Sequence, residues 1–244
     1  MILKGKKALV TGASKGMGRA IAKALALEGV DLFLTGRDSD LLEKLKENLS
    51  KTGVRAAYKA ADLGSEKELN DIFVDALEFL GDIDILINNA GIGIKGNVTE
   101  MAVTDWEQMF SVNLKAPFML SRLAAREMIK KRSGYIINVG SGASQTPIAG
   151  FAGYCATKHG LLGFSESLGL ELRDHNIKVS IILPGSTATH FGGASPENKL
   201  SARPGILRPE DIADSVLYLL KQSDVAWTSV MNLRPLNPKT SPLK

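Results

Sequence analysis

The sequence contains little cysteine and no long apolar run. Cys155 is the single cysteine among 244 residues, which excludes an intrachain disulfide and a cysteine-rich zinc site. No apolar stretch approaches the roughly 20 residues that a membrane-spanning helix needs. At the start, MILKGKKALV returns to charge too soon for the apolar part of a signal peptide. We therefore expect a soluble, cytoplasmic protein without a membrane partner.

Aromatic residues, histidines and net charge are also scarce. Aromatic residues make up 6% of the chain, and the formal net charge is only +4. A weakly basic chain without an aromatic stacking stripe is not typical of nucleic-acid-binding proteins, so we expect no nucleic-acid partner. The three histidines, His159, His175 and His190, lack metal-ligand spacing, so we expect no metal site.

What the sequence does contain is an alternation of short apolar runs and helical patterns. Runs rich in Val, Ile and Leu predict strands at 7–12, 31–36, 54–60, 84–91, 135–141, 178–185 and 229–233. Helical patterns lie between them at 18–29, 38–53, 65–81, 105–134 (with a bend near Pro117) and 154–173. This order predicts an α/β fold, a single doubly wound Rossmann domain over 1–244. Its parallel sheet would have about seven strands and helices on both faces.

Two segments do not fit this alternation. The stretch 186–209 is rich in Gly, Ser and Pro and has little periodicity, so it is predicted to be a substrate loop. His190 lies near its start, and we interpret it as an ordinary loop residue rather than a catalytic one. Residues 235–244 form a proline-containing tail.

A glycine-rich turn, TGASKGMG, joins the first strand to the first helix. Helix amides point outward at such a junction and the helix dipole favours an anion, so phosphate groups bind there. Gly12 permits the tight turn, Gly16 lets the backbone approach a pyrophosphate, and Gly18 allows close helix–strand packing. The sequence therefore predicts a dinucleotide site, with a ligand-free glycine turn as the alternative.

The end of the second strand distinguishes NAD from NADP. An acid there binds the ribose 2′-hydroxyl, whereas an arginine nearby accommodates a 2′-phosphate. Arg37 follows the strand and Lys15 lies inside the glycine turn. Asp31 is at the wrong end of the strand, and Asp38 is better explained as a helix cap. Two cations and no acid predict NADP(H), with a solvated loop charge as the alternative reading of Arg37.

Further along, YCATK places Tyr154 and Lys158 four residues apart. On a helix this spacing puts both side chains on one face, about one turn apart. A cation at that distance favours the phenolate, so we expect Lys158 to lower the pKa of Tyr154 from its usual value of about 10. An ordinary surface pair is the alternative.

Taken together, the motifs resemble those of the short-chain dehydrogenase/reductase family, over roughly residues 4 to 220. The matching segments are TGASKGMG, DL at 62–63, NNAG at 88–91, Asn113, GS at 140–141, YCATK and PGSTAT at 184–189. Each match is weak alone, whereas their order and spacing are specific. The tail departs from the family, because it lacks the usual glycine pair and ends in an RP sequence similar to that of reductases acting on small hydroxy acids and aldehydes.

The resemblance implies catalytic roles. Tyr154 would be the general acid that protonates a carbonyl oxygen, and Lys158 would tune it and bind the nicotinamide ribose. Ser141 would hydrogen-bond the substrate carbonyl. Asn113 would hold a water that links the lysine to solvent. Further cofactor contacts are implied at Ser14, Met17, Asp62, Leu63, Asn89, Ala90, Gly91, Pro184, Gly185, Thr187 and Thr189. For Asn88, bracing the sheet and touching the ligand are equal alternatives.

The function implied is an NADP(H)-dependent oxidoreductase (EC 1.1.1.-) that interconverts a small-molecule carbonyl and an alcohol. One alternative is 3-oxoacyl-[acyl-carrier-protein] reduction in fatty acid synthesis, for which KKR at 130–132 could dock an acidic carrier. The other alternative is a catalytically silent NADPH-binding sensor. The Ser141, Tyr154 and Lys158 set argues against it, because binding alone needs no proton donor. The helices at 105–132 and 154–173 are the usual dimer faces by resemblance, which implies a homodimer or homotetramer.

Overall fold

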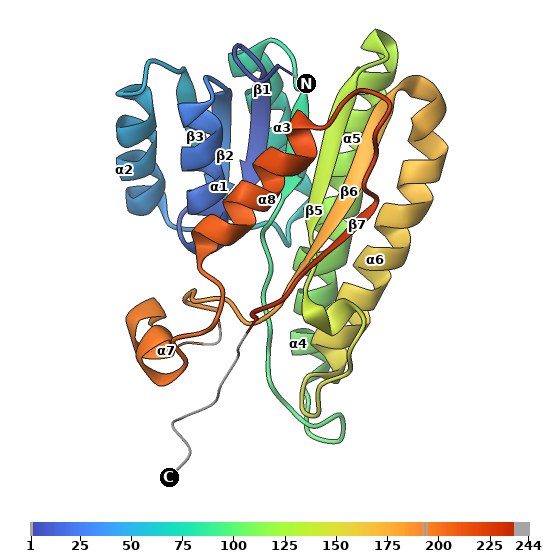
Figure 1. The fold of residues 1–244 in the computed structure, drawn as a ribbon. Coiled ribbons are helices and arrows are strands. Elements are labelled where there is room, and N and C mark those ends of the chain that lie inside the picture. Colours follow the sequence, from blue (N-terminus) through green and yellow to red (C-terminus); the bar gives the residue numbers. More distant parts are fainter. Residues whose placement is uncertain (1, 192, 194, 237–244) are drawn as a thin grey trace.

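Seven strands form one parallel sheet in the order β3-β2-β1-β4-β5-β6-β7 (Figure 1). The structure is a computed structural model that describes residues 2–191, 193 and 195–236. The strands are β1 Lys7–Thr11, β2 Asp31–Gly36, β3 Ala56–Ala60, β4 Ile85–Asn88, β5 Gly134–Val139, β6 Ile177–Pro184 and β7 Val230–Leu233. The chain runs from β1 outward to β3 and then crosses back to β4. The strand order therefore reverses beside β1 and β4, where ligands bind in doubly wound folds.

Helices cover both faces of this sheet, as the sequence predicted. They are α1 Gly16–Leu27, α2 Ser39–Ser50, α3 Glu66–Leu80, α4 Val103–Phe110, α5 Ala116–Lys131, α6 Ala152–Leu172, α7 Pro196–Ala202 and α8 Pro209–Lys221. The first core contains α1, α2 and α8, and the second contains α3 and α5. Strand side chains alternate between the cores: Ile85 and Ile87 enter the first and Leu86 the second. Within the described residues, no helix has the length and apolarity to cross a membrane.

The helix predicted at 105–134 is divided in the structure. A π-helical turn, Ser111–Lys115, separates α4 from α5. The irregularity therefore precedes Pro117, which lies in the first turn of α5, where a missing amide is tolerated. Asn113 is at the centre of the turn and bonds to a neighbouring segment, so we attribute the irregularity to that contact rather than to proline.

The segment predicted as a substrate loop, 186–209, contains a short helix, α7, that the sequence did not predict. Ser195 caps this helix by accepting a hydrogen bond from the Asn198 amide (3.2 Å), and Pro196 occupies its first turn. None of its residues is buried, so no apolar periodicity revealed it. The cap sequence Ser-Pro-Glu was the available signal. In the predicted 235–244 tail, residues 237–244 lie outside the described residues.

A buried polar chain crosses the middle of the sheet. Asn88 faces Asn138 on the neighbouring strand, and its amide donates to the Asn138 Oδ1 (2.8 Å) and the Ser121 Oγ (3.0 Å). The Asn138 amide in turn donates to the Ser165 Oγ (2.8 Å) on α6. Asn88 is only 2% exposed. Of the two roles considered for it, the structure supports bracing the sheet.

Candidate active site

A cleft of about 1160 Å³ lies at the carboxyl edge of the sheet. Residues of α7, the helix at the lower left of Figure 1, contribute to its lining. Its walls come from the ends of β1, β2, β4, β5 and β6 and from the segment 186–209. Pockets for a single small ligand are usually about 300–1000 Å³, so this cleft has room for a dinucleotide and a second molecule.

At one end of the cleft, the glycine turn presents the beginning of α1. Gly12 and Gly16 have φ values of +65° and +58°, in the left-handed region that favours glycine. A Cβ on Gly18 would lie 2.3 Å from the Gly12 carbonyl oxygen, so this position also has no room for a side chain. Lys15 begins the helix without a side-chain cap, and the first turn carries no acid. These features fit the pyrophosphate of a dinucleotide.

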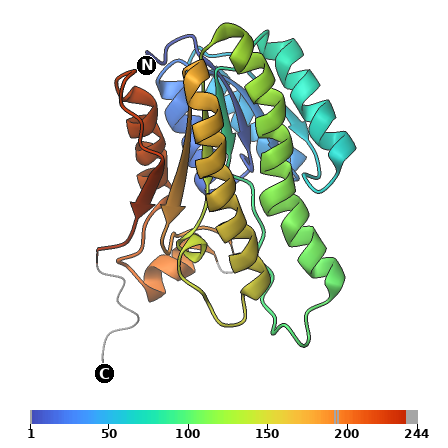
Figure 2. The same ribbon diagram turned by 90° about the vertical axis from the view of Figure 1, so that its right-hand side faces the viewer.

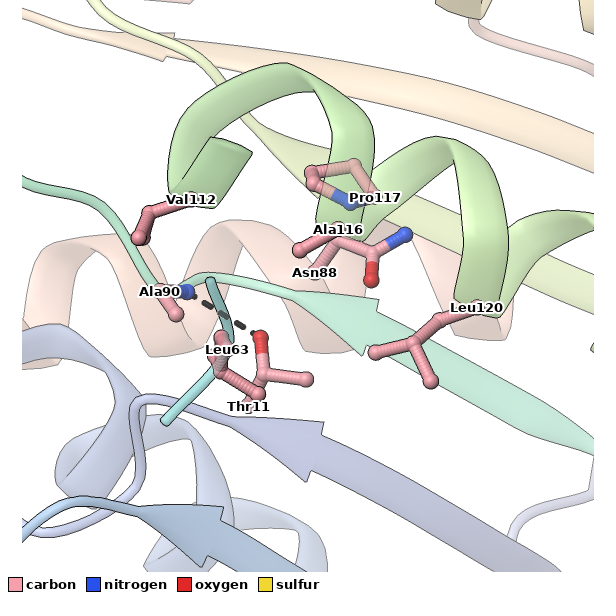
Figure 3. A pocket seen from close by; sticks show the side chains of 8 residues that line it. All are labelled: Thr11, Leu63, Asn88, Ala90, Val112, Ala116, Pro117 and Leu120. Carbon is pink, nitrogen blue, oxygen red and sulfur yellow. Dashed lines mark hydrogen bonds between the residues drawn. The ribbon is translucent and has the colours of Figure 1, made fainter. Parts of the chain in front are cut away.

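Thr11 holds the turn after β4 against this glycine turn. Its hydroxyl oxygen accepts from the amides of Asn89 (3.0 Å) and Ala90 (3.1 Å), as Figure 3 shows for the second bond. The Asn89 side-chain amide donates to the carbonyl oxygens of Thr11 (2.9 Å) and Gly12 (3.2 Å). The small crevice in Figure 3 has no volume for a water-sized molecule, so we regard it as a packing gap. Thr11 was not identified from sequence. The available signal was its position as a polar residue at the end of an apolar strand.

The charges near the second strand are arranged as the sequence predicted. Arg37 and Lys15 are exposed at the cleft, and no ion pair involves either within the described residues. The Asp38 carboxylate caps α2 by accepting from the Leu41 amide (3.1 Å). Asp31, at the other end of β2, pairs with the Arg55 Nε (2.8 Å). The two acids therefore have structural roles, and the two cations face the cleft.

Tyr154, Lys158 and Ser141 meet at the inner wall. The Ser141 hydroxyl and the Tyr154 phenol both line the cleft, and the hydroxyl acts to lower the pKa of the phenol. The Ser141 Oγ accepts from the Ala143 amide (3.1 Å), which fixes its rotamer. The Lys158 Nζ donates to the Val139 carbonyl oxygen (3.0 Å) and lies 5.9 Å from the centroid of the Tyr154 ring. Tyr154 and Lys158 are only 9% and 3% exposed, so the alternative of a surface pair does not describe them.

Burial controls the pKa values of both groups. It raises the pKa of Tyr154, and the Ser141 hydroxyl only partly offsets this. It lowers the pKa of Lys158 to about 8. The expectation that Lys158 lowers the pKa of Tyr154 is therefore wrong for this structure. The physical reason is that the amine is itself desolvated and is directed to the Val139 carbonyl.

Asn113 lies behind this wall and does not line the cleft. Its Oδ1 accepts from the Ile92 amide (2.8 Å), and its Nδ2 donates to the Ile92 carbonyl (2.8 Å) and the Thr157 Oγ1 (3.0 Å). It thus ties the segment after β4 to α6, beside Lys158. A Cβ on Gly91 would lie 3.3 Å from the Asn113 Oδ1 and 3.5 Å from the Lys158 Nζ. The water relay assigned to Asn113 stays a prediction.

The other residues predicted from sequence gather along the same cleft. It is lined by Gly12, Ser14, Lys15, Gly16, Met17, Arg37, Asp62, Leu63, Asn89, Ala90, Gly91, Ser141, Tyr154, Lys158, Pro184, Gly185, Thr187 and Thr189. Gly18 is buried beneath the turn and Asn113 behind the wall. His190, interpreted from sequence as an ordinary loop residue, does line the cleft. Sequence reasoning did not single out five further lining residues, Gly93, Gln108, Ile148, Phe151 and Phe191. Gln108 lies in α4, and the other four lie on loops whose paths sequence does not give.

Comparison with known proteins gives consistent matches. The family model described as short chain dehydrogenase matches residues 6–200. A relative is the 3-oxoacyl-[acyl-carrier-protein] reductase FabG of Aquifex aeolicus (strain VF5), which is 36% identical to this chain over 227 residues. The match covers 90% of this chain and 92% of the relative. The archaeal alcohol dehydrogenase from Thermococcus sibiricus, complexed with 5-hydroxy-NADP, has a TM-score of 0.89 at 28% identity, covering 97% of this chain and 99% of that one. A metagenomic short-chain oxidoreductase in complex with NADP has a TM-score of 0.85 at 36% identity, covering 96% and 99%.

Proposed function

Because the chain belongs to the short-chain dehydrogenase family, we propose that it is an NADP(H)-dependent oxidoreductase interconverting a carbonyl compound and an alcohol. The observation that carries this proposal is the position of Tyr154 on the cleft wall with Ser141, with Lys158 one turn away and its Nζ 5.9 Å from the centroid of the Tyr154 ring. This group lies in the same cleft as a glycine turn that fits a dinucleotide. A nicotinamide cofactor would supply the hydride, which no side chain can provide.

The residues of the chain supply the proton and hold the substrate oxygen. Ser141 and Tyr154 line the same part of the cleft, and the Ser141 hydroxyl is close enough to influence the phenol, so a carbonyl oxygen placed between them can accept from both hydroxyls. The raised pKa of Tyr154 keeps its phenol protonated near neutral pH, which is the form that donates to an oxygen gaining negative charge. The low exposure of Tyr154 and Lys158 limits competition from solvent.

The preference for NADP(H) is supported by Arg37 and Lys15, both exposed at the cleft, and by the NADP compounds in two structural neighbours. We expect Arg37→Ala to raise the KM for NADPH about tenfold or more while leaving the KM for NADH nearly unchanged, because only NADPH carries the 2′-phosphate. Steady-state kinetics with both cofactors would measure this. Arg55→Ala is the matched control, since Arg55 pairs with Asp31 at the opposite end of β2. Equal losses with both cofactors would contradict this role of Arg37.

Reduction of a 3-oxoacyl group on a carrier protein is a second candidate, because the relative from Aquifex aeolicus has that name. The basic segment 130–132 gives it less support than expected. Lys130 pairs with Glu127 (2.7 Å), and Lys131 pairs with Asp82 (2.7 Å). Arg132 donates to the carbonyl oxygen of Asp174 (2.9 Å). Activity on a carrier-bound thioester that Arg132→Glu abolishes would favour this candidate.

The deciding experiment follows NADPH oxidation with ketones, aldehydes, 3-oxo esters and 3-oxoacyl thioesters, with NADH in parallel. We expect turnover with NADPH, and a loss of about 10²- to 10⁴-fold in kcat for Tyr154→Phe with NADPH affinity retained. The retained affinity shows that the lost step is proton transfer. Tight NADPH binding by the wild type without any turnover would favour the sensor alternative, and absence of NADPH binding would contradict the cofactor assignment.

A further inference from the structure

Two phenylalanine rings contact the catalytic tyrosine. The Phe151 ring centroid lies 6.3 Å from that of Tyr154, and the Phe191 centroid lies 5.4 Å from it. These are the separations of attractive aromatic pairs. Phe151 immediately precedes α6, so sequence places it near Tyr154, whereas Phe191 reaches this point from the segment 186–209. Phe191 is 41% exposed and lines the cleft, so part of its apolar ring is left for a ligand.

The space for the Phe191 ring is created by Gly93. A Cβ on Gly93 would lie 2.5 Å from the Phe191 Cζ and 3.4 Å from the Tyr154 Cδ2. The φ of Gly93 lies outside the left-handed region, so its backbone does not require glycine. The missing side chain matters instead because it lets the phenyl ring rest on the tyrosine. A methyl group there would displace the far end of Phe191 rather than disrupt the backbone.

Both the backbone amide and the backbone carbonyl oxygen of Phe191 form hydrogen bonds. Its amide donates to the Thr189 Oγ1 (3.3 Å), and its carbonyl oxygen accepts from the Lys199 Nζ on α7. Thr189 also approaches the glycine turn, because a Cβ on Gly16 would lie 3.3 Å from its Cγ2. These contacts give the ring a defined position between the nucleotide end of the cleft and the phenol.

Further apolar side chains lie beside the tyrosine or line the same cleft. Ala143 and Ile92 pack in the same cluster as Tyr154, and both line the cleft. Ile148 also lines it. The ammonium of Lys199 donates to the Phe191 carbonyl oxygen and is thus directed to the backbone. An uncharged apolar substituent next to the reacting carbonyl would pack against these side chains, whereas a charged one placed against them would lose water.

From these contacts we infer that Phe191, seated in the space left by Gly93, is the specificity-determining residue for a ketone or aldehyde with a small uncharged apolar substituent. The inference rests on the proposed function and adds the class of substrate. The ring packs against the substituent and limits its length, while Ser141 and Tyr154 hold the oxygen.

A kinetic double-mutant cycle tests this inference. The probes are pentan-2-one, octan-2-one and the anion 4-oxopentanoate, with saturating NADPH and the variants Phe191→Ala, Gly93→Ala and the double variant. For the wild type we expect pentan-2-one to have the highest kcat/KM. In Phe191→Ala, the ratio of octan-2-one to pentan-2-one should rise about tenfold or more, since a few methylenes in a pocket discriminate to this degree.

The coupling of the two positions separates the ring contact from a general loss of activity. We expect Gly93→Ala to lower kcat/KM for pentan-2-one about tenfold in the wild type and less than about twofold in the Phe191→Ala background. Ile148→Ala is the matched control, because it removes another apolar wall residue and should combine additively with Gly93→Ala. Equal effects of Gly93→Ala in both backgrounds would overturn the inference, and so would a wild-type preference for 4-oxopentanoate.

Two further measurements keep this inference distinct from the proposed function. NADPH affinity, followed by fluorescence, should be the same in all four proteins. If the wild type binds NADPH and reduces none of the ketones, the substrate class is wrong while the cofactor assignment stands. If NADPH does not bind, the proposed function fails. Urea unfolding of the four proteins still tests the contact, because additive destabilisation would show that Gly93 and Phe191 do not interact.

Discussion

Lys158 combines burial with an ionisable amine. Only 3% of it is exposed, and among the described residues its ammonium donates to a single carbonyl oxygen, that of Val139. Burial without an acidic partner disfavours the charged form, and this lowers the pKa to about 8. Near neutral pH the charged Lys158 ammonium is therefore desolvated in the folded protein, which lowers the free energy of unfolding, whereas in the unfolded chain the ammonium is solvated.

This cost predicts a dependence of stability on pH. Between about pH 8 and pH 10 the unfolded chain binds more protons at this lysine than the folded protein does, so the free energy of unfolding should rise with pH. The slope from one such group is at most about 1.4 kcal/mol per pH unit, and below pH 8 its contribution is flat. The raised pKa of Tyr154 has the opposite sign but acts at higher pH, because an unperturbed phenol titrates near pH 10.

Urea denaturation at pH 7.5, 8.5 and 9.5 would measure this pH dependence of the unfolding free energy. The variant Lys158→Met is the reference that lacks the amine. We expect the difference in unfolding free energy, wild type minus variant, to increase by roughly 1 kcal/mol per pH unit above pH 8. A difference that stays constant over this range would contradict the prediction, because it would mean that the amine carries the same charge in the folded and the unfolded protein.

Single residues were predictable where short spacing determines their place. Gly12, Gly16, Tyr154 and Lys158 fall within turns or one helix, so local geometry alone brings them to the cleft. The contact of Gly93 with Phe191 was not predictable, because it depends on the path of a long segment between two distant parts of the chain. The predicted direction of the Tyr154 pKa shift was wrong for a related reason: burial of the phenol, which depends on the tertiary fold, is the largest influence on it.

At the scale of elements, the strands and the longer helices were predictable because each carries an apolar pattern of the right period. The strand predicted at 31–36 matches β2, and the helix predicted at 65–81 matches α3 to within a residue at each end. The two failures have other causes. The π turn at Ser111–Lys115 depends on tertiary bonds of Asn113, and α7 has no buried face. Neither leaves a periodic signal in the sequence.

For the whole molecule, α5 and α6 lie side by side on the outer surface, as Figure 2 shows. Phe118 on α5 is 46% exposed and packs edge to face on Phe164 of α6, with ring centroids 6.1 Å apart. Leu170, also on α6, is 56% exposed. These apolar side chains lie on the two helices that the family resemblance assigned to dimer contacts, so we expect this face to be buried between copies of the chain.

We expect Phe118→Arg to shift the protein toward monomers, because burying an unpaired guanidinium in an apolar contact is unfavourable. Sedimentation velocity over a range of concentrations would show a weakening of association by at least about tenfold, or 1.4 kcal/mol. Val74→Arg is the control, since Val74 is 60% exposed on α3, outside the two helices. Unchanged association in the Phe118 variant, or an equal effect of both substitutions, would contradict this assignment.

The bond between Asn88 and Asn138 also bears on how the sheet assembles. The two residues face each other across β4 and β5, and both are held among buried side chains. If β5 paired with β4 one residue out of step, Asn138 would point to the opposite, apolar face and both amides would lose their partners. The pair therefore favours the native register of β4 and β5, because a sheet paired out of register has a higher free energy. The native register in turn aligns the strand ends that form the cleft.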